Sequence, residues 1–522
     1  QLSLDILQIL ASNSDTYISR SVIESKLERV SKRAILNELK LLQTQKRVKI
    51  AGQSSQTVYK ISNDYYEEFD ELLYIYQNQI LVGYLGYDYQ TYFFSYDTNY
   101  LITGKYIAKF QMPFSLETFA QESCFVDFEE CLPEGIDRKI LIDKVGNATE
   151  FFLLAHNDYS KNDLIFSSKL LEFVQKLKPQ SYLVNKEKIL GKNKFPNILK
   201  YTIDIDNVSL FPTLHMDETE ELKHVRTMSL SGYQHKLQVV IDEDTIRTPK
   251  NGEDANFFIK PYDPIKANES SEYYFPHIAI NEHLHMSFAK NELNFDVPYN
   301  ALVYHNNNFH YIIKRFDRYK EFAYEQYDFG QLLNIPSRNK YNASSDEVFI
   351  KANEMLKNKN SKIELLRFYF YSYIIQHSDL HVKNIALLNI GKQTFTLSPL
   401  YDVISLGVIK GKDIDDLALP IQRVHKTQKS KFTIEDFLYL ADILELNHLE
   451  VKKEFRNIAL KFIEKFPSYI EDTKKLLDYD SLSISKTRQK KTNLISKLKS
   501  FYDERIIALK KANIFKDLEI PK

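Results

Sequence analysis

A polar loop at residues 378–384, with the sequence SDLHVKN, carries the side chains best suited to chemistry. It follows a stretch of helical pattern and precedes the strand-like residues 385–388. Transfer of a phosphoryl group to a hydroxyl needs a carboxylate that receives the hydroxyl proton, and an amide oxygen five residues later that holds Mg²⁺. Asp379 and Asn384 have this spacing. The loop therefore predicts a general base at Asp379 and a metal ligand at Asn384.

A second metal ligand is expected at Asp402, in the segment PLYDVIS (399–405) that follows a strand pattern. A carboxylate at this place holds the metal that bridges the phosphates in kinases. Each of these residues, taken alone, is also typical of a turn in which Asp or Asn caps the backbone. Their order along the chain favours the catalytic interpretation.

Two further residues are suited to binding nucleotide phosphates. The strand-like segment NFFIK (256–260) ends in Lys260, and Glu282 lies on the next predicted helix. A strand lysine paired with a helix glutamate positions the α- and β-phosphates in kinases, although strand lysines also commonly extend to solvent. The loop SLSGYQHK (229–236) can cover the phosphates, but its single glycine satisfies neither the glycine-rich kinase loop nor a Walker motif.

The elements that must position these residues follow from periodicity. Strands are expected at 237–241, 256–260, 301–305 and 310–316 and a helix at 277–290, after which the pattern is mostly helical. Aromatic-rich alternation at 80–87 and 92–96 indicates a small α+β domain before them. We expect domains at residues 1–63, 64–180, 181–325 and 326–522.

The N-terminal residues predict a winged helix. Ser19 and Ser31 are expected helix N-caps, apolar residues at 35, 36, 39 and 42 give the third helix a core face, and residues 47–50 and 57–61 alternate as a hairpin. Residues 1–62 carry ten basic side chains against five acidic ones. We expect this part to bind duplex DNA; docking onto a protein or dimerisation is the alternative. The expected DNA contacts are Lys32, Arg33, Asn37, Lys40, Arg47 and Lys49.

Composition sets the class of protein. The chain has 522 residues, enough for about three or four domains. Its net charge of -1 excludes a global basic field, and 43% hydrophobic with 27% charged residues excludes disorder throughout. The only cysteines, Cys124 and Cys131, argue against a disulfide scaffold or zinc finger. Because the apolar runs are short, we expect a cytoplasmic protein without membrane association.

In their order along the chain, these segments resemble the HipA-like serine/threonine kinases of bacterial toxin-antitoxin systems. Residues 229–236 are similar to the family's phosphate loop, and FIK (258–260) is similar to its nucleotide-lysine strand. KRFDR (314–318) resembles the segment that joins its two lobes, and residues 379–384 and 400–405 resemble its catalytic and metal-binding segments. QYD (326–328), KY (340–341) and LPEG (132–135) with Arg138 extend the resemblance.

The resemblance implies an α+β multidomain protein in which a two-lobed protein-kinase-like fold, with a mostly helical C-terminal lobe, follows the winged helix-turn-helix and the small α+β domain. It implies ATP and Mg²⁺ as cofactors and a protein serine as acceptor, with aminoacyl-tRNA synthetases as the best-known targets and growth arrest as the result. The nucleotide-binding residues it implies are Ser229, Ser231, Gly232, Lys236, Lys260, Glu282, Lys314, Phe316, His381 and Lys383.

Regulation is expected in the phosphate loop, since the family autophosphorylates there. Ser229 matches the modified serine, and Ser231 is a second candidate. A phosphoserine adds about two negative charges beside the ATP phosphates and should repel nucleotide. The alternative is that both hydroxyls only form hydrogen bonds within the turn.

The chain departs from the family at three places. Leu380 and Val382 stand where the family more usually has Gly and Ala. The DNA-binding part is fused, whereas in familiar systems it resides in a separate antitoxin; whether such an antitoxin or a homodimer is also a partner stays open.

Three histidines cluster on or beside the predicted helix at 277–290. We expect His277, His283 and His285 to be helix-surface residues rather than zinc ligands, and His381 to support the catalytic loop by hydrogen bonding. The competing hypothesis for the whole chain is a DNA-binding transcription regulator whose kinase fold only senses nucleotide. The presence of Lys260, Asp379, Asn384 and Asp402 favours an active kinase, because a kinase fold that had lost activity is expected to lack at least one of them.

Overall fold

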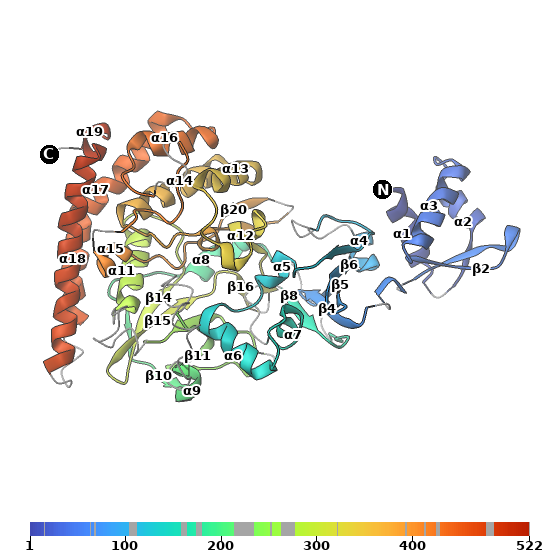
Figure 1. Cartoon of the computed structure of the whole chain (residues 1–522), viewed down its shortest axis with the longest axis horizontal. Helices are drawn as coiled ribbons and strands as arrows, with labels where there is room; N and C mark the ends of the chain where they lie inside the picture. The colour runs from blue at the N-terminus through green and yellow to red at the C-terminus, as the bar shows by residue number, and fades with distance from the viewer. Residues whose placement is uncertain are drawn as a thin grey trace. The chain divides into compact units, whose positions relative to one another are not determined.

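The structure is a computed structural model. It describes residues 1–14, 16–62, 64–66, 69–103, 112–157, 164–173, 180–212, 234–250, 253–262, 277–320, 322–391, 394–411, 414–423, 429–476 and 485–520, without the side chains of 55, 64 and 485–493. The chain forms two compact units, one of Gln1–Leu132 and Leu141–Lys178, the other of Pro133–Ile140 and Pro179–Lys522 (Figure 1). Within the described residues, no helix is long and apolar enough to cross a membrane.

The first unit begins with short helices and a small antiparallel sheet. The helices are α1 (Leu2–Ala11), α2 (Arg20–Lys26) and α3 (Lys32–Thr44). The sheet has the order β1-β3-β2, from β1 (Ile18–Ser19), β3 (Val58–Ile61) and β2 (Val48–Ala51). Ser31 caps α3 by accepting a hydrogen bond from the Ala34 N–H at 3.2 Å, and Ile35, Leu39 and Leu42 are fully buried. The predicted cap, core face and hairpin are therefore confirmed.

Arg47 corrects one of our predictions. Its side chain is fully buried, and Nη1 donates to the Tyr96 carbonyl at 2.7 Å and to Thr98 Oγ1 at 3.0 Å. Nη2 donates to the Leu116 carbonyl at 3.0 Å, and the guanidinium lies over the Tyr65 ring at 3.5 Å. The expectation that Arg47 contacts DNA is wrong, because the whole guanidinium is used inside the protein.

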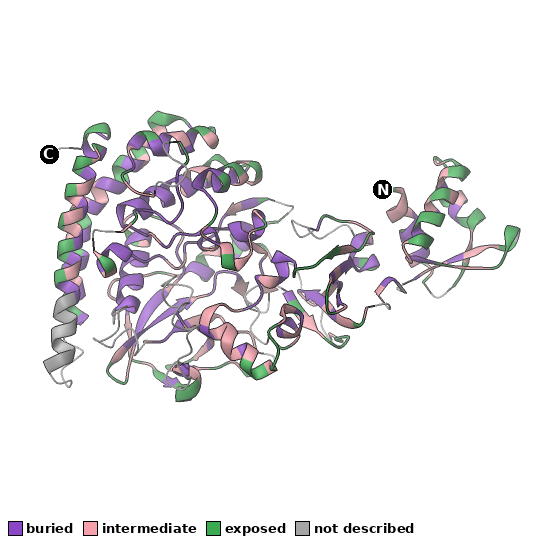
Figure 2. Cartoon of the chain, in the orientation of Figure 1, coloured by how far each residue is buried: buried purple, intermediate pink, exposed green. Residues whose placement is uncertain are grey.

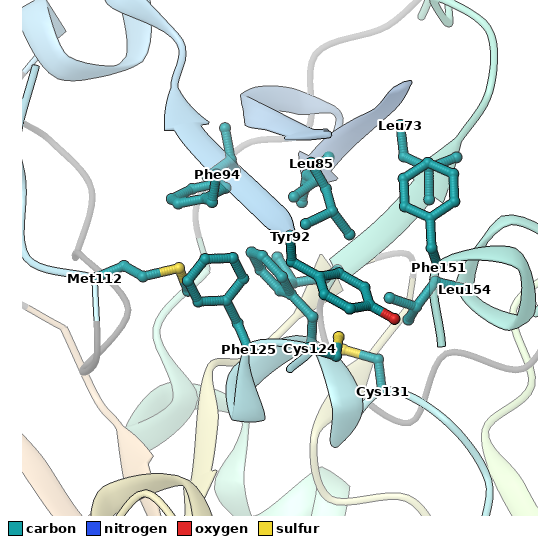
Figure 3. Packing of buried hydrophobic residues seen from close by; sticks show 14 of the residues in the cluster. Leu73, Leu85, Tyr92, Phe94, Met112, Cys124, Phe125, Cys131, Phe151 and Leu154 are labelled. Atoms are coloured by element: carbon teal, nitrogen blue, oxygen red, sulfur yellow. The ribbon is translucent and has the colours of Figure 1, made fainter. Parts of the chain in front are cut away.

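The second sheet of this unit is antiparallel, with the order β7-β6-β5-β4-β8. The helices α4 (Thr98–Thr103), α5 (Val126–Glu129) and α7 (Glu150–Ala155) belong to the same unit. Aromatic and aliphatic side chains fill its core, among them Phe94, Phe125 and Phe151 (Figure 3), and the thiols of Cys124 and Cys131, which form no disulfide, are buried there. The strands are β4 (Glu71–Gln77), β5 (Ile80–Tyr87), β6 (Tyr92–Tyr96), β7 (Phe119–Gln121) and β8 (Leu164–Ser167), so the predicted bounds of β5 and β6 are confirmed.

The second unit is built on a mixed sheet with the order β10-β12-β11-β13-β15-β14-β9, whose outer pairs β10 with β12 and β14 with β9 are parallel. Its strands are β9 (Ile198–Leu199), β10 (Thr202–Asp204), β11 (Leu237–Asp242), β12 (Thr245–Arg247), β13 (Phe257–Lys260), β14 (Asn300–His305) and β15 (Asn308–Lys314). The helices α6 (Gly135–Val145), α8 (Tyr182–Leu190), α9 (Asn207–Leu210) and α11 (Ile278–Asn291) begin in this unit. The predicted strands and helix of this region are confirmed within a few residues.

Helix α11 lies deep inside this unit and contacts β14, β15 and the long helix α17 (Figure 2). His283 and His285 are fully buried, and His277 is 8% exposed. His283 Nδ1 pairs with Asn300 Oδ1 at 2.6 Å, and its Nε2 accepts from the Asn197 N–H at 3.0 Å. The expectation that these histidines lie on a helix surface is therefore wrong, because tertiary packing covers every side of the helix.

The remainder of the unit is mostly helical, as predicted. Two small sheets interrupt it, with the orders β16-β17 and β18-β19-β20. The strands are β16 (Arg318–Tyr319), β17 (Phe322–Ala323), β18 (Gln326–Asp328), β19 (Ala386–Asn389) and β20 (Phe395–Leu397). The helices are α12 (Phe329–Leu332), α13 (Ser345–Met355), α14 (Lys359–Ile374), α15 (Leu406–Lys410), α16 (Ile434–Ile443), α17 (His448–Thr473), α18 (Ser485–Lys511) and α19 (Ile514–Asp517).

Candidate active site

The ammonium of Lys260, at the end of β13, lies between two carboxylates. Its Nζ donates to Glu282 Oε1 at 2.7 Å and Oε2 at 2.9 Å, and also contacts Asp402 Oδ1. Glu282 comes from helix α11, and Asp402 from the segment between β20 and α15. Lys260 and Glu282 are buried, and the side chain of Asp402 is 19% exposed. The structure thus brings together three residues that are far apart in the sequence. Glu282 lies 22 positions after Lys260, and Asp402 lies 142 positions after it.

The charges of Lys260, Glu282 and Asp402 shift one another's pKa values. Burial alone lowers the pKa of Lys260, but Asp402 and Glu282 outweigh that effect and raise it. Burial raises the pKa of Glu282 to about 7, against the opposing charge of Lys260. Burial also opposes ionisation of Asp402, yet Lys260 and then Lys236 hold its pKa below the usual range. Asp402 is therefore the carboxylate that stays ionised at neutral pH, and Lys236 adds positive potential beside it.

The backbone at Asp402 is strained. Its φ is +54°, in the left-handed region that residues other than Gly seldom adopt, although Asn and Asp do so more often than the rest. Such residues cost on the order of 1 kcal/mol and persist where the surroundings fix them. Here the ion pair with Lys260 and the packing of the next residues, Val403 and Ile404, fix the position.

Asp379 lies in the loop between α14 and β19 and is 2% exposed. The hydroxyl of Tyr341 donates a hydrogen bond to its Oδ1. Asn384 Nδ2 donates to the Asp379 carbonyl at 2.9 Å, which closes the loop on itself. Tyr341 therefore orients the predicted base, a role that its sequence position did not reveal.

The residues present fit a magnesium ion. Asn384 uses its amide nitrogen for the loop, and within the described residues no donor contacts its side-chain oxygen. Asp402 supplies an ionised carboxylate. Amide and carboxylate oxygens are the ligands Mg²⁺ prefers, usually with one or two carboxylates and substrate phosphates. No cluster of three or more His, Cys, Asp or Glu suited to a metal occurs in the part of the chain that the structure describes.

Lys383 of this loop and Lys340 beside it share one acid, Glu134. Lys383 Nζ contacts Glu134 and donates to Ser337 Oγ at 2.9 Å. Lys340 Nζ donates to the other oxygen of Glu134 at 3.1 Å. The loop is thereby tied to the segment Pro133–Ile140, which the sequence did not predict.

His381 corrects a further prediction. It is 3% exposed, and neither ring nitrogen has a hydrogen-bond partner among the described residues. Its ring instead packs edge-on against Tyr341, with 5.0 Å between centroids. Burial lowers the pKa of His381 to about 3, and the nearby Lys340 adds to this effect. The neutral ring supports the loop by packing rather than by the hydrogen bonding we expected.

Two further predicted nucleotide residues, Phe316 and Lys314, make contacts with other parts of this unit. Phe316 is buried and stacks on Tyr401, with 5.6 Å between centroids. Lys314 Nζ donates to the Lys188 carbonyl at 2.7 Å. Ser229, Ser231 and Gly232 lie outside the described residues.

Comparisons with known proteins identify the family. Residues 228–470 match the family described as the HipA-like C-terminal domain, and residues 73–157 match the HipA N-terminal domain. The chain belongs to the HipA-like kinase family. Similar curated proteins include a putative kinase of Haemophilus influenzae, 31% identical over 197 residues, which are 34% of this chain and 53% of that protein.

A second relative, the putative kinase Y4mE of Sinorhizobium fredii, is 26% identical over 188 residues, which are 34% of this chain and 42% of that protein. The chain thus matches about half or less of the length of these curated relatives. A solved structure of the Shewanella oneidensis MR-1 toxin-antitoxin system HipA, HipB and its operator DNA is similar with a TM-score of 0.55 and 14% identity. The match covers 83% of this chain and 99% of the HipA structure's chain, which shows that the two share a fold.

Proposed function

We propose that the chain is an ATP- and Mg²⁺-dependent kinase that phosphorylates a serine or threonine of a protein. The observation that carries this proposal is the Lys260 ammonium held between Glu282 and Asp402. A strand lysine in this pairing is the phosphate-anchoring part of a kinase site. In this proposal the large mixed sheet with α11 forms the N-terminal lobe, and the helices from α12 onward form the C-terminal lobe.

Each group has a task in the proposed reaction. Lys260 binds the α- and β-phosphates, and Glu282 keeps its ammonium in place. Asn384 and Asp402 hold Mg²⁺, which when bound neutralises charge on the phosphate oxygens. Asp379 receives the proton of the acceptor hydroxyl as that oxygen attacks the γ-phosphorus, and the bond from the γ-phosphorus to the bridging oxygen breaks to release ADP. Tyr341 keeps the carboxylate oriented.

The acceptor, regulation and further partners are part of the same proposal. The family resemblance favours a protein such as an aminoacyl-tRNA synthetase as acceptor, and growth arrest as the result. We also propose that Ser229 or Ser231 becomes phosphorylated and that its added charge weakens ATP binding. A HipB-type antitoxin is a candidate partner, because the similar solved structure contains HipA with HipB and operator DNA.

The test is phosphate transfer by purified protein supplied with Mg²⁺ and ATP, followed by intact mass and peptide mapping. Wild type is expected to add phosphate to itself or to an added protein, while Asp379→Ala is expected to fold and to transfer at a rate lower by a factor of about 10³ or more. Equal transfer by both proteins excludes Asp379 as the base. Phosphate mapped only outside residues 227–236 excludes the loop as the regulatory site.

DNA binding is a second function that one observation favours. Lys32, Arg33, Asn37 and Lys40 are exposed on helix α3, and Lys49 is exposed on β2. We propose that this part is a winged helix whose α3 enters the major groove of duplex DNA.

Its test is titration of the full chain with duplex DNA from its own promoter at two salt concentrations. Binding is expected to weaken as salt rises, with a slope of about -0.9 per phosphate contact. The Lys32→Ala, Arg33→Ala, Lys40→Ala triple variant is expected to lose that binding. Binding that survives the triple change would assign this surface to a protein partner.

A further inference from the structure

The segment Pro133–Ile140 lies between two stretches of the first unit in the sequence but belongs to the second unit. It contains the turn at Gly135, whose φ of +57° suits glycine, and the start of helix α6. Glu134 and Asp137 lie three residues apart on this segment. Both carboxylates contact the unit that contains the candidate active site.

Glu134 binds the lysines at the catalytic loop. One oxygen contacts Lys383 Nζ and the other accepts from Lys340 Nζ at 3.1 Å. These lysine side chains are only 8% and 9% exposed, and that of Glu134 is 22% exposed. A charge-assisted pair with this little exposure is shielded from solvent and holds its members in one arrangement. Since Ser337 also accepts from Lys383, the ammonium is fixed from two sides.

Asp137 binds His235 and Lys236, which directly precede strand β11 and are the described end of the predicted phosphate loop. Its Oδ1 contacts His235 Nδ1, and its Oδ2 accepts from the Lys236 N–H at 3.3 Å. His235 Nε2 also lies 2.8 Å from the Ser209 carbonyl, so the imidazole is held on both nitrogens. The positive charge of Lys236 acts on Asp402 and Glu282. Asp137 thus fixes the backbone that carries this charge to the site.

We propose that Glu134 and Asp137 are positioning residues for phosphoryl transfer: Glu134 sets Lys383 at the catalytic loop, and Asp137 sets Lys236 at the phosphate loop. This inference rests on the proposed kinase function. It joins both loops to one short segment, which keeps the base and the phosphates at a fixed separation. Misplacement by about 1 Å can cost a factor of about 10² in rate, so such a clamp matters for catalysis.

The two acids should affect different kinetic parameters. Glu134→Gln keeps the shape but removes the charge that orients Lys383, and the limiting transfer rate should fall about tenfold with little change in ATP affinity. Asp137→Asn should weaken ATP binding about tenfold, because His235 and the Lys236 backbone at the end of the phosphate loop lose a charged partner. Glu134→Asp, which keeps the charge, should recover part of the rate.

The experiment measures initial phosphate transfer by the full chain over a range of ATP concentrations, together with calorimetric ATP binding and thermal unfolding. Asp143→Asn is the matched control, because Asp143 is exposed on the same helix α6. Glu134→Gln is also combined with Lys383→Met. If Glu134 acts through Lys383, the double variant should be no slower than Lys383→Met alone.

The outcomes separate the two proposals. Transfer by wild type together with equal kinetics of Glu134→Gln and Asp143→Asn overturns the positioning role and leaves the kinase function standing. Effects of Glu134→Gln and Lys383→Met that multiply independently also overturn it. Absence of transfer by wild type removes the proposed function itself. In that case, equal ATP affinity of Asp137→Asn and Asp143→Asn overturns the role of Asp137 as well.

Discussion

Asn281 and Ser405 exchange two hydrogen bonds through a side-chain amide. Asn281 Nδ2 donates to the Ser405 carbonyl at 2.9 Å, and the Ser405 N–H donates to Asn281 Oδ1 at 3.0 Å. Asn281 precedes Glu282 in α11, and Ser405 follows Asp402 by three residues. The same contact therefore fixes the distance between the two carboxylates that hold Lys260.

Replacing Asn281 by Ala should lower the free energy of unfolding by about 2–4 kcal/mol, because it leaves a buried N–H and a buried carbonyl unpaired. It should also weaken ATP binding, since Asp402 loses its support. Urea unfolding and calorimetry measure both effects. Asn360→Ala on the exposed start of α14 is the control, and a variant at 281 as stable as this control would refute the role.

Replacing Tyr341 by Phe should slow phosphate transfer about tenfold while changing the stability little, because only the hydroxyl that orients Asp379 is removed. Initial rates at saturating ATP test this expectation. Tyr304→Phe, which removes an exposed hydroxyl 3.4 Å from Asn307, makes the same chemical change elsewhere. Equal rates of the two variants would show that Asp379 needs no such donor.

The pKa of Glu282 predicts a pH dependence of stability in the nucleotide-free protein. Because burial raises this pKa from 4.5 to about 7, the folded state binds a proton between these values that the unfolded state has lost. The unfolding free energy should therefore fall by about 1–3 kcal/mol as pH rises through this window, relative to Glu282→Gln.

Urea unfolding of wild type and Glu282→Gln between pH 5 and pH 8 checks this sign. The difference between the two profiles isolates Glu282 from the other carboxylates. Parallel profiles, or a difference that grows in the opposite direction, would contradict the raised pKa.

Arg505 of helix α18 supports the chain just before the catalytic loop. Its guanidinium donates to the carbonyls of Ile374 at 3.1 Å and Tyr373 at 2.6 Å and to Asp416 Oδ1 at 2.8 Å, and it is 3% exposed. Arg505→Ala should lower the unfolding free energy by about 3–5 kcal/mol, because it leaves a buried acid without its cation.

The control for Arg505 is Arg456→Ala. Arg456 is exposed and makes one long hydrogen bond of 3.3 Å to the Glu519 carbonyl, so its loss should cost about 0.5 kcal/mol or less. Urea unfolding that ranks the two variants equally would show that α18 is not needed beneath the loop.

What the sequence predicts well here is local or follows a known order of motifs. Alternation identified β5 and β6, and the cap at Ser31 identified the start of α3, since these patterns depend on neighbours in the chain. The pairing of Lys260 with Glu282 was predicted because a lysine at the end of a strand and a glutamate on the next helix form such a pair in kinases, and it is confirmed as a contact. The roles assigned to these residues stay predictions.

What it misses depends on partners far along the chain. Arg47 stands among basic residues and was therefore expected at the surface, but its partners Tyr96 and Leu116 lie 49 and 69 residues away in the sequence. Glu134 binds lysines that are 206 and 249 residues away. No periodicity or turn pattern carries such information, because the same side chain suits solvent and a buried pair equally well.

The burial of α11 has a consequence for control of the site. Of its fourteen residues, all described, twelve are buried, and five of these are large apolar side chains. Exposing those five to water would cost on the order of 10 kcal/mol, which is comparable to the whole stability of a domain. A switch that swings this helix outward, and so separates Glu282 from Lys260, would nearly unfold the protein. The pairing of Glu282 with Lys260 is therefore a constant feature of the fold, and we expect any on-off control of the proposed kinase to act on the nucleotide or the acceptor instead.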